Sequence, residues 1–299
     1  MHASLRRDTQ VRNAEIIYLM EYVTLRSGLR LPMIGFGTFP LRGEELKAVL
    51  RLTAEAGYEL YDSAFLYKNE ADIGACLKEG ILRRESVVLT SKIQGIQYTG
   101  RRRWLHLDRV SVRKAYRLAC RKFATESLDL YLLHSPFDGY TKAYKELIDL
   151  YQVGGVKAIG VSNFDVQQLR ALYEACGEYP MLNQIELHPF NAMEEIVGFC
   201  QEHDIQVEAY SPFGRGNLVG AIMGNERLKE IGAAHGKTVG QVVLRWIVQQ
   251  GIVTIPRSTN AGRIRQNLEV FDFALSNREM AYIDSLNQDK SYGRHFQHQ

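Results

Sequence analysis

Short apolar runs alternate with longer amphipathic stretches along most of this chain of 299 residues. Eight apolar runs follow one another after residue 32, at 33–39, 60–64, 87–93, 128–135, 156–162, 182–187, 205–211 and 252–258. The segments between them carry apolar residues at helical spacing, as in 44–57, 108–123, 165–177 and 192–204. Nearly continuous apolar strands separated by amphipathic helices are typical of a parallel sheet that helices cover. Eight repeats of this unit predict a closed (β/α)8 TIM barrel, which is an α/β fold.

Two further elements flank the predicted barrel. The sequence YVTLRSGLRLP at 22–32 is typical of a β-hairpin with its turn at Ser27-Gly28, and we expect it to close the barrel floor. A capping box, SNRE, predicts an extra C-terminal helix from Asn277 to about Leu286.

The chain has no Pro-, Gly- or Ser-rich linker, so we predict one barrel domain over 21–299, preceded by a flexible N-terminal extension at 1–20. A doubly wound α/β fold is the structural alternative. Its glycine-rich dinucleotide-binding loop is missing, because GFGTFP supplies Gly35 and Gly37 but has Pro40 where the third glycine belongs. Any dinucleotide must therefore be held in another way.

Composition and charge are those of an ordinary globular protein, with 45% hydrophobic and 24% charged residues. A net charge of +3 gives no argument for nucleic-acid binding, and no apolar stretch is long enough to span a membrane. The first 20 residues lack the continuous apolar core of a secretory signal. The four cysteines form no CxxC pair and lie on apolar helical stripes, so we expect buried thiols, no metal site and a reducing, cytoplasmic location. They are Cys76, Cys120, Cys176 and Cys200.

Four polar side chains stand at or just beyond the ends of three successive apolar runs. They are Asp62, Tyr67, Lys92 and His134. A lone charge at the end of a buried strand is costly to desolvate unless it has partners. Because parallel barrel strands all end at the same rim, we expect these four groups to converge there.

Together the four groups can protonate a carbonyl oxygen. A phenol, with a pKa near ~10, is a weak acid at neutral pH, and a neighbouring ammonium lowers that pKa by stabilising the phenolate. We therefore assign Tyr67 as the acid, Lys92 as the group that tunes it and Asp62 as the anchor of Lys92. His134 is assigned a hydrogen bond to the carbonyl oxygen. Any one of these residues alone is more often structural, but four at equivalent strand ends favour catalysis.

The same residues carry a resemblance to the aldo-keto reductase family. Its successive motifs are matched, in order, by DSAFLYKNEADIG, LTSKI, LDLYLLHSP, IGVSNF, NQIELHP, AYSPFGRG and IPRSTNAGRIRQN. The likeness runs from about Tyr22 to Leu286 and places the four polar residues on the family's catalytic tetrad. It implies a (β/α)8 barrel that reduces aldehydes or ketones with NADPH and binds this cofactor without the glycine-rich loop.

The resemblance also implies cofactor contacts, residue by residue. Ser162, Asn163 and Gln184 match the groups that hydrogen-bond the nicotinamide carboxamide. Tyr210 matches the aromatic ring that stacks on the nicotinamide, and Ser211 begins the loop that lies over the pyrophosphate. The adenosine end is matched by Arg257, Ser258, Thr259, Arg263 and Asn267.

Two arginines and neighbouring hydroxyls near a predicted helix start suit a phosphate, which favours NADP(H). Family members more often carry lysine where Arg257 stands, and arginine keeps the charge while adding bidentate geometry. Gln266 stands where many relatives have an acid that contacts the adenine, so that contact is not carried over.

Phe39, just past the first strand, and Trp104 are candidate apolar walls for the substrate. Trp104 follows Arg101–Arg103 in a basic segment at 97–108, which we interpret as a solvated loop or a subunit contact rather than an anion site.

These inferences predict a monomeric NADPH-dependent carbonyl reductase that acts on a small-molecule aldehyde or ketone, with no nucleic-acid or membrane partner. The alternative is a non-catalytic NADP-binding regulatory subunit on the same barrel, resembling potassium-channel β subunits. The short, unpatterned N-terminal segment disfavours it. A barrel glycosidase with Glu186 and Glu208 as its carboxylate pair is a weaker option, because it leaves Lys92 beside a phenol unexplained.

Overall fold

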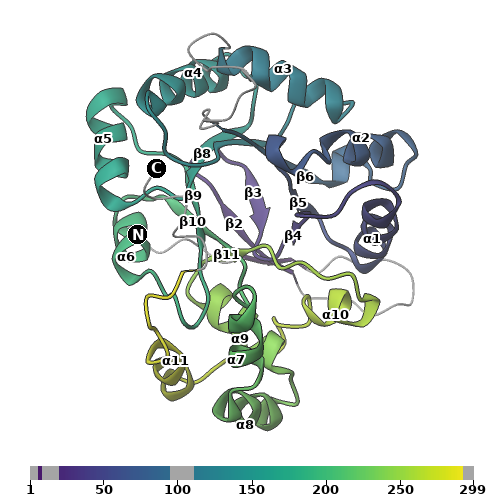
Figure 1. Cartoon of the computed structure of the whole chain (residues 1–299), viewed down its shortest axis with the longest axis vertical. Coiled ribbons are helices and arrows are strands. Elements are labelled where there is room, and N and C mark those ends of the chain that lie inside the picture. The colour runs from purple at the N-terminus through teal and green to yellow at the C-terminus, as the bar shows by residue number, and fades with distance from the viewer. Residues whose placement is uncertain (1–5, 9–19, 95–110, 292–299) are drawn as a thin grey trace.

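The structure is a computed structural model that describes residues 6–8, 20–94 and 111–291. Within these ranges, parallel strands form one eight-stranded sheet in the order β11 (Val253–Thr254), β10 (Gln206–Tyr210), β9 (Leu182–Glu186), β8 (Ala158–Ser162), β7 (Leu130–Leu133), β6 (Val88–Ile93), β5 (Leu60–Asp62) and β4 (Phe36–Gly37). A parallel bridge between Ile34, which lies two residues before β4, and Thr254 of β11 joins the two edges of the sheet, so the sheet closes on itself. Figure 1 shows the strands as an inner ring surrounded by helices. The predicted (β/α)8 barrel is confirmed.

At least one helix follows each barrel strand. The helices are α1 (Gly43–Ala56), α2 (Glu70–Lys78), α3 (Val112–Lys122), α4 (Tyr140–Gln152), α5 (Val166–Cys176), α6 (Glu194–Glu202), α7 (Asn217–Met223), α8 (Glu226–His235), α9 (Val239–Gln249), α10 (Ala261–Gln266) and α11 (Asn277–Asp284), with short 3-10 helices η1 (Phe65–Tyr67) and η2 (Arg84–Ser86). Every barrel strand lies within one of the eight apolar runs, although β4 and β11 are only two residues long. Among the described residues, no helix is long and apolar enough to cross a membrane.

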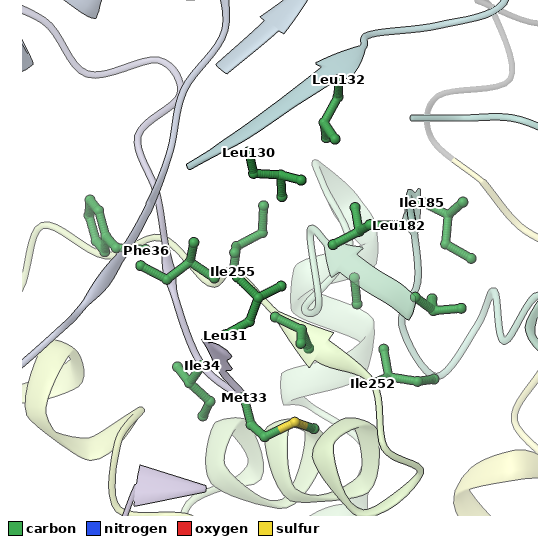
Figure 2. Packing of buried hydrophobic residues seen from close by; sticks show 14 of the residues in the cluster. Leu31, Met33, Ile34, Phe36, Leu130, Leu132, Leu182, Ile185, Ile252 and Ile255 are labelled. Atoms are coloured by element: carbon green, nitrogen blue, oxygen red, sulfur yellow. The ribbon is translucent and has the colours of Figure 1, made fainter. Parts of the chain in front are cut away.

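A small antiparallel sheet lies at one end of the barrel. Its strands are β1 (Arg6–Asp8), β2 (Met20–Thr24) and β3 (Arg30–Pro32), and β2 pairs with both of the others. The turn between β2 and β3 contains Gly28, whose φ of 86° favours glycine. Leu31 of β3 is fully buried, and Figure 2 shows it among barrel-lining residues near Met33 and Ile34. The predicted hairpin is therefore present.

The predicted C-terminal helix begins as expected and ends slightly early. The Ser276 side chain accepts from the Glu279 backbone, and Glu279 in turn accepts from the Ser276 backbone, which completes the capping box of α11. The helix stops at Asp284, while Leu286 still closes a turn onto Ile283. The difference of two residues is within the usual uncertainty of a helix end.

The barrel interior changes from apolar to polar along its axis. Figure 2 shows Leu130, Leu132, Leu182 and Ile255 pointing into one packed cluster. The last residues of several strands are instead polar and buried, as with Asp62 at the end of β5. Because all eight strands run in one direction, these polar ends share the same rim.

Gly160, in the middle of β8, marks a point where the interior has no room for a side chain. A Cβ there would lie 2.5 Å from the Leu182 carbonyl oxygen and 2.8 Å from Leu132 Cδ2. We expect Gly160→Ala to lower the free energy of unfolding by about 1–3 kcal/mol, because backbone must shift to relieve the overlap. Gly198→Ala in α6 is the control: no atom lies within 4 Å of its added Cβ, so alanine should stabilise by about 0.5–1 kcal/mol. Denaturant unfolding measures both, and equal effects would contradict this account of β8.

Candidate active site

The structure brings the four predicted polar residues together at the rim formed by the strand ends. Asp62 ends β5, Tyr67 ends η1, Lys92 lies near the end of β6, and His134 directly follows β7. The Lys92 Nζ lies 2.6 Å from Asp62 Oδ1 and 2.7 Å from Asp62 Oδ2. It lies 3.5 Å from the Tyr67 hydroxyl, which is long for a hydrogen bond but close enough for strong electrostatic coupling. The rings of Tyr67 and His134 meet edge to face, with centroids 5.6 Å apart.

Lys92 is fully buried and keeps its charge through its partners. Its ammonium also donates to the Ser63 carbonyl oxygen at 3.1 Å. Burial lowers the pKa of Lys92, but the charge of the Asp62 carboxylate and its hydrogen bond to the ammonium oppose burial, and the net pKa is raised. The ammonium is therefore charged at neutral pH, and a buried charge of this kind requires the close pairing that Asp62 provides.

The pKa of Tyr67 is raised, whereas we expected from the sequence that Lys92 would lower it. Burial raises the pKa of Tyr67 and is the dominant effect, Lys92 lowers it as expected, and Arg215 also lowers it. The net pKa is raised, because desolvation of the phenolate outweighs the two cations. At neutral pH Tyr67 therefore holds its proton and has it available to give.

His134 is held in its neutral form. Burial, and secondarily the charge of Lys92, lower the pKa of His134 to about 3. Its Nδ1 is buried and has no hydrogen-bond partner among the described residues. A neutral ring with its proton on Nε2 leaves Nδ1 as an unpaired acceptor, which costs less than an unpaired donor, so Nε2–H is the group free to donate.

We expect His134 to remain uncharged from about pH 8 down to about pH 5, because its pKa lies well below the usual range near 6.5. The ring-proton NMR signals of His134, assigned with a His134→Gln variant, should not move across this range. An exposed imidazole such as free histidine titrates there and serves as the reference. A His134 shift centred near about pH 6.5 would contradict the burial argument.

One cavity of about 650 Å³ joins these groups and opens at the rim. Asp62, Tyr67 and His134 line it, while Lys92 lies behind them. This volume is typical of a site for a small ligand or cofactor. Phe39, a predicted substrate wall, lines the cavity with its ring centroid 5.0 Å from that of Tyr67. The other predicted wall, Trp104, lies outside the described residues.

The residues expected at the nicotinamide end lie beside the tetrad. Ser162, Asn163, Gln184 and Tyr210 all line the cavity. Asn163 has a left-handed φ of 62° and is fixed by hydrogen bonds: its amide donates to the His134 carbonyl oxygen at 3.1 Å and accepts from the Tyr210 hydroxyl at 2.8 Å. These bonds hold the Tyr210 ring at the cavity wall.

The side-chain amide of Gln184 is fixed by hydrogen bonds to two carboxyl groups. Its Nε2 donates to Asp62 Oδ1 at 2.9 Å and also to Glu208 Oε1. Both contacts are carboxyl oxygens, so the amide must present its nitrogen to them and its oxygen elsewhere. The Ser162 hydroxyl donates to the Gln184 backbone oxygen at 2.9 Å.

The residues expected at the adenosine end are split between two locations. Arg257 lines the same cavity as the tetrad, and so does Ser211 of the loop expected over the pyrophosphate. The remaining four follow β11 or belong to the α10 region and do not line it. They are Ser258 and Asn267, which are buried, and Thr259 and Arg263, which are exposed.

The sequence did not lead us to assign Arg215 or Glu208 to this site. Arg215 lines the cavity, donates to Ser211 Oγ at 2.7 Å and lies over the ring of Tyr210 with its Cζ 5.5 Å from the centroid. The basic residue within the AYSPFGRG motif was the available signal. Glu208 was considered only as one of a glycosidase pair with Glu186.

The glycosidase option finds no geometric support. Glu208 is fully buried and Glu186 is 4% exposed, and neither lines the cavity. Glu186 accepts from the Ser291 hydroxyl at 2.7 Å, and Glu208 accepts from Gln184. Both carboxyl groups are thus engaged in hydrogen bonds within the protein and do not line the cavity.

Comparisons with known proteins identify the family to which the chain is similar. A family model described as the aldo/keto reductase family matches residues 33–288. The chain is 39% identical over 277 residues to the 9,11-endoperoxide prostaglandin H2 reductase of Trypanosoma cruzi (strain CL Brener), covering 91% of this chain and 93% of that protein. It is 37% identical over 281 residues to the glyoxal reductase of Bacillus subtilis (strain 168), and the match covers 92% of this chain and 96% of that protein. A solved structure of a Gox0644 mutant in complex with NADPH has a TM-score of 0.78 at 32% sequence identity. The match covers 89% of this chain and 93% of the chain in that structure.

The parallel barrel and the relatives named as reductases place the protein among the barrel oxidoreductases. The chain belongs to the aldo/keto reductase family.

Proposed function

We propose that this protein reduces small aldehydes or ketones with NADPH and that Tyr67 is the general acid. The observation that carries the proposal is the position of the Tyr67 hydroxyl, which lies 3.5 Å from the buried Lys92 ammonium on a side chain that lines a cavity. Burial raises the pKa of Tyr67, which favours a phenol that keeps its proton until it is needed. Support also comes from relatives, since one is named a glyoxal reductase and a solved neighbour is in complex with NADPH.

The residues around the cavity fit a nicotinamide cofactor. Tyr210 offers an aromatic face, held in place by Asn163, and the oxygen of Gln184 is not used by Asp62 or Glu208. Arg257 lines the same cavity and offers a permanent positive charge for a phosphate, with Arg263 nearby in the chain on α10. When bound, NADPH supplies the hydride that reduces the carbonyl carbon.

The chain's own residues handle the proton and the charge. The Tyr67 hydroxyl gives its proton to the carbonyl oxygen, so the new O–H bond forms as the phenolic O–H bond breaks. The phenolate left behind is stabilised by Lys92, which Asp62 holds charged and in place. His134, neutral and free to donate from Nε2, binds and orients the same oxygen.

The test is NADPH binding followed by turnover. Quenching of protein fluorescence, or a change in NADPH fluorescence, should report saturable binding to the purified protein. Addition of glyoxal, methylglyoxal or an aromatic aldehyde should then consume NADPH in proportion to the alcohol formed. Binding of NADPH without turnover of any aldehyde or ketone would favour the regulatory-subunit alternative. If neither nicotinamide cofactor binds, both the reductase and the NADP-binding regulatory subunit are excluded.

A further inference from the structure

A second buried carboxyl group lies next to the Asp62–Lys92 pair. Glu208 is fully buried on β10, directly opposite Gln184 in the parallel register of β9 and β10. Its Oε1 accepts from Gln184 Nε2, which also donates to Asp62 Oδ1. One amide nitrogen therefore bridges the two carboxyl groups across the barrel interior, with one of its two hydrogens to each.

The charges in this cluster balance only if Glu208 is protonated. Asp62 and Lys92 already form a neutral pair. An ionised Glu208 would therefore add an unpaired negative charge to a cluster whose three members are all buried. The charged groups facing Glu208 are Asp62 from β5 and Lys92 from β6. Its paired neighbours on β9 and β11 are Gln184 and Val253, and neither titrates.

The surroundings of Glu208 favour a carboxylic acid over a carboxylate. Glu208 Oε2 is buried and has no hydrogen-bond partner among the described residues. A neutral carboxylic acid costs less free energy to bury there than a carboxylate, because the carboxylate would bury negative charge that nothing compensates. Burial, followed by repulsion from Asp62, raises the pKa of Glu208 to about 8, against the opposing effects of Gln184 and Lys92.

We propose that Glu208 is a positioning residue which, while protonated, holds Gln184 and Asp62 in the arrangement that Tyr67 needs, and that loss of its proton in mild alkali slows carbonyl reduction. The proposal rests on the proposed function of Tyr67. Ionised Glu208 adds a negative charge that competes with Tyr67 for the field of Lys92. Less of that field then stabilises the phenolate, and Tyr67 becomes a weaker acid.

Glu208→Gln tests the pH dependence, because glutamine has the shape of the protonated acid and cannot ionise. In the wild type, kcat/KM for reduction should fall about tenfold between about pH 7 and about pH 9, as a group with a pKa of about 8 loses its proton. In the variant this fall should shrink to about twofold or less. The matched control is Glu186→Gln on the neighbouring strand, which should retain the wild-type fall. An unchanged alkaline fall in Glu208→Gln would overturn the proposal.

A second measurement uses the free protein and does not depend on activity. The infrared carbonyl stretch of a protonated carboxylic acid should be present in the wild type at neutral pH and disappear with a midpoint near about pH 8. It should be missing from Glu208→Gln and retained in Glu186→Gln. If the wild type lacks this band at neutral pH, Glu208 is ionised and the proposal is wrong, whatever the outcome for Tyr67. If the band is present while Tyr67→Phe remains fully active, the proposed function fails instead.

Discussion

Replacing Tyr67 with phenylalanine should reduce kcat for aldehyde reduction by about 10²- to 10⁴-fold, the usual contribution of a positioned general acid. The ring of Tyr67 packs against Phe39 and His134, and phenylalanine preserves both contacts while removing the hydroxyl that lies 3.5 Å from Lys92. The variant therefore loses the proton donor and little of the packing. We expect its Kd for NADPH to stay within about threefold of the wild type, because the expected nicotinamide contacts come from other residues.

Single-turnover reduction, followed by NADPH absorbance, measures this effect without interference from product release. Tyr282→Phe is the matched control, since its hydroxyl bonds Asn225 at 3.2 Å and does not line the cavity. That control should react at the wild-type rate. A Tyr67→Phe protein that reduces the same aldehyde within about fivefold of the wild type would remove Tyr67 from the role of acid and leave proton delivery to another group.

The sequence was sufficient to predict the barrel because its strands are buried on both faces. Such strands appear as uninterrupted apolar runs, and all eight runs contain a strand. The length of β4 and β11 was not predictable in the same way. Strand ends depend on which backbone groups find partners across the sheet, and here the barrel closes through an isolated bridge at Ile34 and Thr254.

The candidate site was predictable where polar residues interrupt apolar runs. Asp62, Lys92 and His134 stood out because a charge or imidazole at the end of a buried strand needs a partner, and the structure places them within one cluster. The net acidity of Tyr67 was not predictable, because burial outweighs Lys92 and burial depends on the whole packed structure. The bridge from Asp62 to Glu208 depends on the register of β9 and β10, which spacing along one chain does not specify.

Replacing Lys92 with methionine should give the largest loss of stability of any change at the site. Methionine approximates the length of lysine, so packing is largely kept, but Asp62 is left as a buried charge without its cation. Breaking a buried pair from one side typically costs about 3–5 kcal/mol, because the remaining charge has lost both water and its partner. Chemical denaturation of the cofactor-free protein, analysed as two-state unfolding, measures the change.

The double variant Asp62→Asn/Lys92→Met identifies the cause of that loss. With no charge left in the pair, it should regain at least about half of the lost free energy, giving a coupling energy of about 1.5 kcal/mol or more in the double-mutant cycle. Lys157→Met is the matched single control. Lys157 pairs with Asp129 at 2.7 Å but is 59% exposed, and Arg84 also pairs with Asp129, so its loss should cost less than about 1 kcal/mol. If Lys92→Met costs no more than Lys157→Met, the Lys92 charge is not held by desolvated pairing with Asp62, and the electrostatic basis for Tyr67 as the acid fails with it.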